Sequence, residues 1–256
     1  MQTNSNEQYE QCPVCNGTGW EEYTKDGYVF VRECKCGIRQ QKIMNGKLSF
    51  ANIPEAFAGV RLESFKEEAY EDAKSRGKAA MAVKAVKYWY SEFEEMNERG
   101  MGLYIYSETK GSGKTRMAVS IANELIHDKR IPVKFATSLQ ILNAIKKSWD
   151  KNGESEGELL DYLSSTDVLI IDDFGTEQVK DWIGERFYQI INARYIDKKV
   201  TIYTSNVRLD DLQYDDRITN RIKERTFLIP FPEESVRNII AKQNMSELIQ
   251  GIRKGG

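Results

Sequence analysis

The sequence predicts an α/β fold in which a parallel β-sheet is flanked by helices, preceded by a small module that carries the cysteines. Two observations lead to this expectation. From residue 103 onward, short apolar runs typical of buried strands alternate with segments of helical periodicity. All four cysteines, in contrast, lie between residues 12 and 36. We therefore expect residues 1–52 to form a cysteine module with its connector and residues 53–256 to form the α/β domain.

The cysteine module has the sequence pattern of a metal site. Its cysteines form one C-x₂-C pair and one C-x-C pair: Cys12 with Cys15, and Cys34 with Cys36. Between the pairs, two short strands around a turn at residues 25–27 are predicted, the hairpin with which zinc ribbons bring two cysteine pairs together. Gly17 and Gly19 permit a tight loop in which backbone N–H groups face thiolates. We expect one Zn²⁺ bound by four cysteines; the alternative is a disulfide pair, which a reducing compartment disfavours.

The α/β domain is predicted element by element. A helix is expected from Glu67 to about Asn97, ended by Gly100 and Gly102. Five apolar runs follow as strands: residues 103–106, 133–136, 168–171, 200–204 and 227–231. Helical periodicity separates several of these runs, at residues 114–127, 139–149 and 179–195. An amphipathic helix is expected over residues 233–252.

Composition and charge exclude several classes of function. The net charge of −2 means that any contact with nucleic acid must come from a local basic patch. His127 is the only histidine and lies at the predicted end of a helix, so Ser-His-Asp hydrolysis and His-rich metal catalysis are poor candidates. Residues 1–10 are polar and lack the apolar stretch of a signal peptide, and no apolar run of the sequence approaches the length needed to span a bilayer. We expect a cytoplasmic protein without a membrane partner.

The first functional motif is a glycine-rich loop between a predicted strand and a predicted helix, with the sequence SETKGSGKT. This is the arrangement of a P-loop, in which backbone N–H groups surround nucleotide phosphates. Lys114 is expected to reach the β- and γ-phosphates, and Thr115 to ligate Mg²⁺. The residues expected to bind ATP are Lys110, Gly111, Ser112, Gly113, Lys114, Thr115 and Arg116. Glu108 departs from the usual pattern, which has glycine there; its carboxylate could weaken nucleotide binding, and the alternative is that it points away from the phosphates.

A second motif, VLIIDDFG, places two carboxylates at the C-terminal end of a predicted buried strand, the edge where open α/β sheets bind ligands. Asp172 is expected to bind Mg²⁺ together with Thr115, while Asp173 orients or deprotonates the attacking water. The alternative is that both carboxylates cap a helix beginning near Thr176. The next strand ends in the sequence TSN, and Asn206 could reach the γ-phosphate and the water from there.

Two basic stretches have less specific patterns. Arg217, Arg221 and Arg225 recur every four residues on one face of a predicted helix, which is either a solvated face or one that reaches a neighbouring subunit. A second stretch combines charge with one aromatic ring that could stack on a base of single-stranded DNA: Lys146, Lys147, Trp149 and Lys151. The alternative for this stretch is a solvated helix face with the tryptophan packed inward.

Five segments, ETKGSGKT, VLIIDDFG, TSN, DDRITNRIKER and PEESVR, occur in this order and resemble the DnaC/DnaI helicase-loader and IstB-like group of AAA+ ATPases. The resemblance covers roughly residues 53–242 and implies a P-loop NTPase fold of the AAA+ type that hydrolyses ATP. It also implies three roles: Asn206 as the sensor-1 residue, Arg221 as the arginine finger acting in trans, and Arg237 as the sensor-2 arginine acting in cis. Arg217 is the near alternative for the finger.

The same resemblance implies partners. It implies binding of single-stranded DNA, self-association, and delivery of a hexameric, DnaB-like replicative helicase onto DNA. A cysteine-bearing N-terminal region is similar to that of DnaI-type loaders, whose zinc module docks on the helicase. Two other functions stay open: an IstB-like transposition helper, and an adaptor that holds nucleotide without hydrolysing it. A small-molecule P-loop kinase is disfavoured because no acceptor pocket or lid motif is evident.

Overall fold

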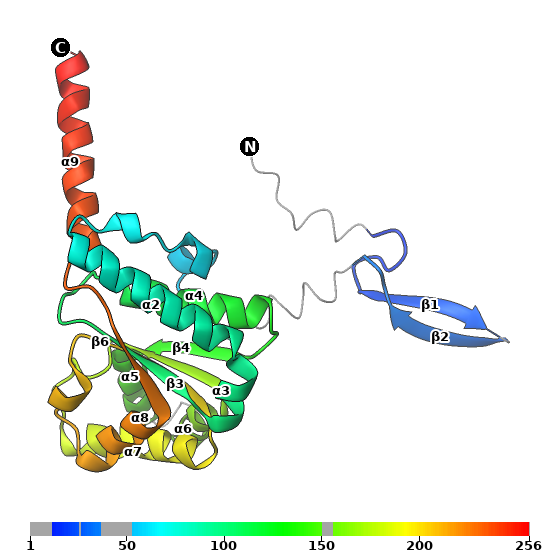
Figure 1. Cartoon of the computed structure of the whole chain (residues 1–256). Helices are drawn as coiled ribbons and strands as arrows, with labels where there is room; N and C mark the ends of the chain where they lie inside the picture. The colour runs from blue at the N-terminus through cyan, green and yellow to red at the C-terminus, as the bar shows by residue number, and fades with distance from the viewer. Residues whose placement is uncertain (1–11, 26, 37–52, 150–155, 256) are drawn as a thin grey trace. The chain divides into compact units, whose positions relative to one another are not determined.

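The computed structural model describes residues 12–25, 27–36, 53–149 and 156–255 (Figure 1). The chain divides into two compact units, Met1–Phe50 and Ala51–Gly256. Asp26 in the predicted turn and Lys151 in the second basic stretch lie outside the described residues.

The first unit contains the predicted hairpin. Strands β1 (Trp20–Lys25) and β2 (Tyr28–Glu33) pair in antiparallel register, with Tyr23 opposite Phe30. The two rings stack with their centroids 5.6 Å apart. Both strands are largely exposed, and a two-stranded sheet of this size is marginal in water without further support. The cysteines that flank the hairpin supply a structural anchor at its base.

The second unit begins with short 3₁₀ turns followed by two helices. The turns are η1 (Glu55–Phe57), η2 (Leu62–Ser64) and η3 (Glu67–Ala69), and the helices are α2 (Ala73–Ser91) and α3 (Phe93–Arg99). The single helix predicted over residues 67–97 is therefore wrong. The first break occurs because Asp72 adopts an extended conformation and its side chain accepts the Ser75 N–H as an N-cap. Gly100 ends α3 in the left-handed conformation, as predicted.

A five-stranded parallel sheet forms the centre of the second unit. Its strands are β3 (Gly102–Tyr106), β4 (Val133–Thr137), β5 (Val168–Asp172), β6 (Val200–Ser205) and β7 (Thr226–Pro230). Their order is β4-β5-β6-β3-β7, and every pair is parallel. The predicted parallel sheet is confirmed. Because all strands run the same way, the chain leaves β3, β5 and β6 at the same edge of the sheet.

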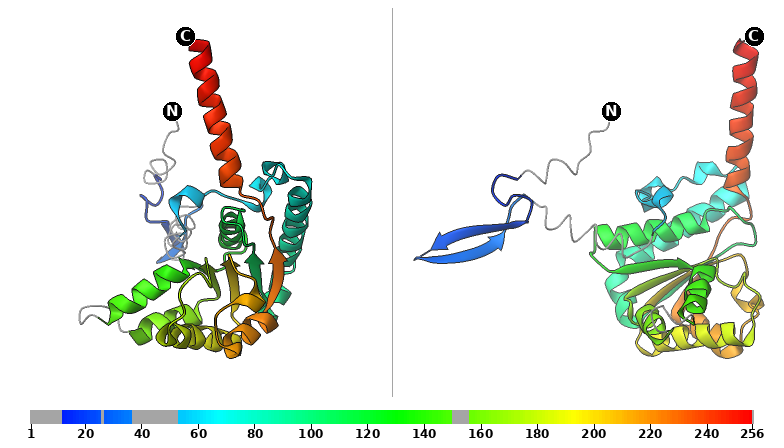
Figure 2. Two further views of the ribbon diagram at one scale, coloured as in Figure 1. Left: turned by 90° about the vertical axis from the view of Figure 1, so that its left-hand side faces the viewer. Right: turned by 180° about the vertical axis from the view of Figure 1, so that it is seen from behind.

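Helices cover both faces of this sheet (Figures 1 and 2). The remaining helical elements are α4 (Lys114–His127), α5 (Ser138–Ser148), α6 (Glu156–Ser165), α7 (Asp181–Ile196), η4 (Leu209–Asp211), α8 (Asp216–Arg225) and α9 (Val236–Gly255). Helices α5 to α8 share one hydrophobic cluster with the sheet, while α2 and α4 lie over the other face. Within the described residues, no helix combines the length and apolarity that crossing a membrane would require.

Candidate nucleotide-binding site

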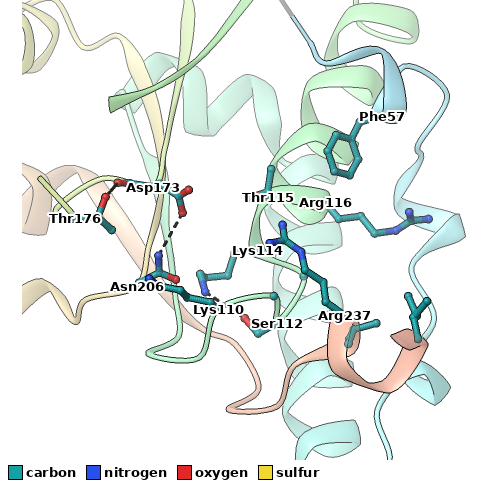
Figure 3. A pocket seen from close by; sticks show the side chains of 14 residues that line it. Phe57, Lys110, Ser112, Lys114, Thr115, Arg116, Asp173, Thr176, Asn206 and Arg237 are labelled. Atoms are coloured by element: carbon teal, nitrogen blue, oxygen red, sulfur yellow. Dashed lines mark hydrogen bonds between the residues drawn. The ribbon is translucent and has the colours of Figure 1, made fainter. Parts of the chain in front are cut away.

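The P-loop lies where β3 passes into α4, as the sequence predicts. Gly111 and Gly113 both have positive φ, and Gly113 forms the N-cap of α4. A Cβ at Gly113 would lie 3.1 Å from the hydroxyl of Tyr70, which itself donates to the Ser112 carbonyl at 2.6 Å. This contact fixes the loop from outside. All seven residues expected to bind ATP line a cavity of about 400 Å³ at the loop (Figure 3).

Lys114 places its ammonium group inside this loop. Its Nζ donates to the Ser107 carbonyl at 3.1 Å, the Thr109 carbonyl at 2.9 Å and the Ser112 hydroxyl at 3.2 Å. Burial lowers the pKa of Lys114, while the nearby carboxylates, Asp173 foremost, oppose this shift. A cation held among neutral carbonyls is an electrostatic site for an anion, and phosphate oxygens suit it chemically.

Thr115 and Asp172 meet behind the loop. The Thr115 hydroxyl donates to the Asp172 carboxylate at 3.0 Å, and the Thr204 hydroxyl donates to the same carboxylate at 2.5 Å. Asp172 is 4% exposed, and burial raises its pKa. A hydroxyl and a carboxylate next to a phosphate site are oxygen donors of the kind that Mg²⁺ takes, so the residues fit the metal that the sequence predicts.

Asp173 points into the pocket next to Asn206 (Figure 3). Its backbone has a positive φ of 54°, and its N–H donates to the Thr204 hydroxyl at 3.0 Å. The Asn206 amide donates to the Asp173 carboxylate at 3.3 Å. The alternative role for these carboxylates, capping a helix that begins near Thr176, is wrong because α7 begins at Asp181. The strained backbone aims an exposed carboxylate at the space beside the P-loop.

Arg237 lies on the opposite side of the pocket, in the first turn of α9 (Figure 3). Apolar side chains of Phe57, Val236 and Ile240 line the cavity near it. Sequence reasoning missed these three residues and Thr176, which also lines the pocket. Phe57 reaches the cavity only through the folding of a distant segment, whereas Val236 lies within PEESVR and Thr176 directly follows VLIIDDFG, so the nearness to these motifs was the available signal.

Glu108, the departure from the usual P-loop pattern, does not disturb the pocket. It is exposed, is not among the lining residues of the cavity, and does not have positive φ. The backbone at this position therefore has no need of glycine. Of the two alternatives for Glu108, the arrangement favours the one in which the carboxylate points away from the phosphate site.

The arginine row lies away from this pocket, on α8. Arg217 stacks over the Tyr188 ring at 4.9 Å, and Arg221 lies between the Tyr188 and Tyr195 rings at 5.1 and 5.5 Å. Arg221 also donates to the Asn192 side chain at 2.8 Å. None of these guanidinium groups lines the cavity formed by its own P-loop. The structure thus brings Arg237 to the pocket but not Arg217 or Arg221.

The second basic stretch lies at the end of α5. The Trp149 ring packs edge-on against Trp182 at 5.2 Å but remains 50% exposed, and its Nε1 donates to Glu156. Lys146 lies 5.5 Å from the Trp182 ring. Trp149 is therefore neither fully packed inward nor free in solvent.

The single histidine is structural. His127 is the last residue of α4, as predicted, and burial lowers its pKa. Burial therefore favours the neutral form of this imidazole.

The four cysteines converge in the first unit. Their Sγ atoms all lie within 4.8 Å of one another. Cys12 and Cys34 are 3.8 Å apart, and Cys15 and Cys36 are 3.6 Å apart. A tetrahedral zinc ion with Zn–S bonds of about 2.3 Å sets its ligands about 3.8 Å apart, whereas a disulfide needs about 2 Å. The cluster is compatible with zinc and contains no disulfide.

The loop after the first pair also suits a metal. Gly17 and Gly19 have positive φ. Burial alone would raise the pKa of the Cys15 thiol, but backbone N–H groups of Gly19 and Gly17 and the neighbouring thiols lower it to about 6. Backbone N–H groups that face this sulfur favour its thiolate, which is the form that binds zinc, whereas the neighbouring thiols raise the pKa of Cys34.

We expect the full-length chain, purified without added metal, to contain about one zinc ion, because four sulfurs already have tetrahedral spacing. Cys15→Ser should lose most of this zinc, as measured by elemental analysis. Val14→Ser is the matched control, since Val14 is an exposed residue between the two cysteines of the first pair. A folded wild-type protein without zinc would contradict the assignment.

The strand, glycine loop and helix, with two carboxylates at the end of β5 on the same edge of the sheet, define a P-loop nucleotide-binding protein with the AAA+ fold. The chain belongs to the family of IstB-like ATP binding proteins, whose family model matches residues 104–237. The family resemblance inferred from the motifs is therefore confirmed.

The chain is similar to several named proteins over part of their length. It is similar to the "Uncharacterized protein YqaM" of Bacillus subtilis (strain 168), with 26% identity over 217 residues, which are 82% of this chain and 65% of YqaM. It is similar to the "Replicative helicase loader DnaC" of Escherichia coli (strain K12), with 27% identity over 134 residues, 52% of this chain and 54% of DnaC. This chain thus spans less than two thirds of the length of both relatives. The crystal structure of the DnaC helicase loader has a similar fold, with a TM-score of 0.59 and 22% identity, covering 70% of this chain and 99% of that one.

Proposed function

We propose that this protein is an ATP-dependent loader of a replicative hexameric helicase. The observation that carries the proposal is the P-loop pocket, in which Lys114, Asp173 and Asn206 meet, in a chain similar to replicative helicase loaders. The protein binds ATP with Mg²⁺, binds single-stranded DNA, and hydrolyses ATP at an interface between subunits. It works in the cytoplasm, where replicative helicases act on bacterial DNA.

The residues of the pocket have different roles in phosphoryl transfer. Lys114 and the loop N–H groups hold the β- and γ-phosphates, and Thr115 with Asp172 would hold Mg²⁺. When bound, Mg²⁺ neutralises charge on the phosphate oxygens. Asp173 accepts a proton from the attacking water, and Asn206, hydrogen-bonded to Asp173 at 3.3 Å, keeps that carboxylate aimed at the γ-phosphate.

Two arginines complete the site from different chains. Arg237 lines the pocket of its own chain and acts in cis as the sensor-2 residue. Arg221 lies outside its own pocket, which supports a role in the site of a neighbouring subunit, with Arg217 as the alternative. The tyrosines beneath the row hold these guanidinium groups in an ordered array.

The zinc-bound cysteine module would dock on the helicase. Its hairpin exposes large side chains that a partner can cover: Trp20 is 44% exposed and Tyr28 is 71% exposed. For single-stranded DNA, the half-exposed Trp149 and the neighbouring Lys146 and Lys147 supply an aromatic ring and positive charge.

The test is capture of the helicase from the native cell. Tagged full-length protein is expected to enrich the replicative helicase, identified by mass spectrometry, about tenfold more with ATP than without nucleotide. Lys114→Ala, which removes the phosphate-binding cation, should abolish the difference. Wild-type protein that captures no helicase under either condition would overturn the loader assignment.

The same experiment separates the other functions. The family to which the chain belongs is named for IstB, so capture of a transposase in place of a helicase would identify a transposition helper. A chain that binds ATP, captures a partner and never releases phosphate would be an adaptor. Both outcomes contradict the loader with ATPase activity.

A further inference from the structure

The segment between β7 and α9 lies along the P-loop. The Phe231 N–H donates to the Tyr106 carbonyl at 2.7 Å, and the Val236 N–H donates to the Gly111 carbonyl at 3.1 Å. A Cβ at Gly111 would lie 2.8 Å from the Ser235 hydroxyl. The two ends of the loop are thus bracketed by one short segment from the far end of the chain.

Glu233 is the charged residue at the centre of this contact. Its Oε2 accepts the Thr109 N–H at 2.9 Å and the Ser107 hydroxyl at 2.9 Å. Its Oε1 faces the Glu108 N–H at 3.4 Å, a longer and weaker contact. One carboxylate therefore accepts hydrogen bonds from three consecutive residues in the first turn of the P-loop.

These donors need an acceptor. Ser107 is completely buried, and the single proton of its hydroxyl has acceptors from this segment in the Glu233 carboxylate and in the Pro232 carbonyl at 2.8 Å, while its oxygen accepts the Thr109 N–H at 3.2 Å. The N–H groups of Glu108 and Thr109 lie before the part of the loop that wraps phosphates. Without Glu233, the Glu108 N–H would lose this carboxylate as its acceptor and the Thr109 N–H would keep only the longer bond to the Ser107 hydroxyl at 3.2 Å, so the first turn would sample other conformations more readily.

The carboxylate stays ionised in this place. Partial burial alone would raise the pKa of Glu233, but hydrogen bonds from Ser107, Thr109 and Glu108 lower it below its ordinary value. A negative charge close to a phosphate site has two opposite effects. It repels the phosphates, which weakens nucleotide binding, and it orders the loop, which strengthens binding.

We propose that Glu233 is a positioning residue for ATP: it holds the first turn of the P-loop in its phosphate-binding form, and this ordering outweighs its repulsion of the phosphates. The inference rests on the ATP binding that is part of the proposed function. Glu233 acts through the loop and does not itself contact the reacting atoms.

The neighbouring glutamate supplies a matched control. Glu234 accepts the N–H groups of Glu71 and Asp72 at 2.9 and 3.2 Å, before the first turn of α2. It has the same charge and nearly the same place in the chain, but its contacts are to α2 and not to the P-loop. Removing it changes the local charge without releasing the loop.

The experiment measures ATP affinity by calorimetry, and KM and kcat by phosphate release, for full-length protein. Glu233→Ala is expected to raise the Kd and KM for ATP about tenfold while kcat at saturation falls less than about threefold. Glu233→Gln, which keeps the shape and one acceptor oxygen, should lie between Glu233→Ala and wild type. Glu234→Ala should bind ATP within about twofold of wild type.

The opposite sign overturns the inference. If repulsion dominates, Glu233→Ala and Glu233→Gln both bind ATP as tightly as wild type or more tightly. An equal loss of affinity in Glu234→Ala would also overturn it, since that loss would come from a general disturbance of the segment. If the wild-type protein does not bind ATP, the proposed function itself is wrong. If the wild type binds and hydrolyses ATP and Glu233→Ala has the same ATP affinity, only the role of Glu233 is wrong.

Discussion

Asp173→Asn is expected to bind ATP with nearly wild-type affinity and to hydrolyse it at least about a hundredfold more slowly. Asp173 is exposed in the pocket, and its carboxylate is held there by the Asn206 amide at 3.3 Å. Asparagine keeps the size of the side chain but cannot take a proton from water. Phosphate release measured beside binding of a fluorescent ATP analogue separates the two effects.

Lys114→Ala provides the contrast, because it should lose ATP binding itself. Its ammonium contacts three oxygens of the loop, and no other lysine within the described residues is buried there. If Asp173→Asn hydrolyses ATP normally, another group activates the water. Glu108 is then a poor substitute, since it is exposed and does not line the pocket.

Much of the fold could be predicted from the sequence because the patterns that mark strands and helices are local. Strands buried on both faces have almost continuous apolar runs, and all five strands lie within a residue or two of their predicted bounds. Helix α4 has the predicted bounds at both ends, since Gly113 adopts the left-handed conformation before it and Lys114 begins it. These elements need no information from distant segments.

The missed features depend on contacts between distant segments. The break before α2 requires the Asp72 cap, and the Glu71 and Asp72 N–H groups bind Glu234 from the other end of the domain. Arg194 is another example. In the sequence it resembles an exposed helix charge, yet it is 1% exposed and donates to backbone carbonyls at the start of β6 and the end of α6.

The residues of the candidate site likewise fall into two groups, those predictable from local motifs and those that depend on contacts between distant segments. The residues proposed to contact phosphates or metal lie in short motifs, because one loop and two strand ends position them. Glu233 and Tyr70 contact the P-loop from outside, and no sequence pattern predicts that role for either residue. Phe57 reaches the pocket from η1, more than fifty residues before the loop. Residues that shape a site are harder to predict than residues that act in it.

Arg221→Ala is expected to bind ATP normally and to hydrolyse it about a hundredfold or more slowly, because an arginine finger stabilises charge that develops only in the transition state. Its guanidinium lies over Tyr188 and Tyr195 and outside its own pocket. Arg217→Ala, tested in parallel, decides between the two candidates. Arg225→Ala is the matched control, since this arginine also stacks on Tyr195 but donates to the Arg99 carbonyl of its own chain.

Mixing two inactive variants tests whether Arg221 acts in trans. Arg221→Ala retains Asp173, and Asp173→Asn retains Arg221, so a mixed interface can join one intact pocket to one intact arginine. We expect phosphate release to return in the mixture, toward about a quarter of the wild-type rate if the subunits pair at random. The mixture must first be shown to co-assemble, for example on single-stranded DNA, by light scattering. An assembled mixture that stays inactive would mean that Arg221 serves its own chain, because no neighbour can then supply what the Arg221→Ala subunit lacks.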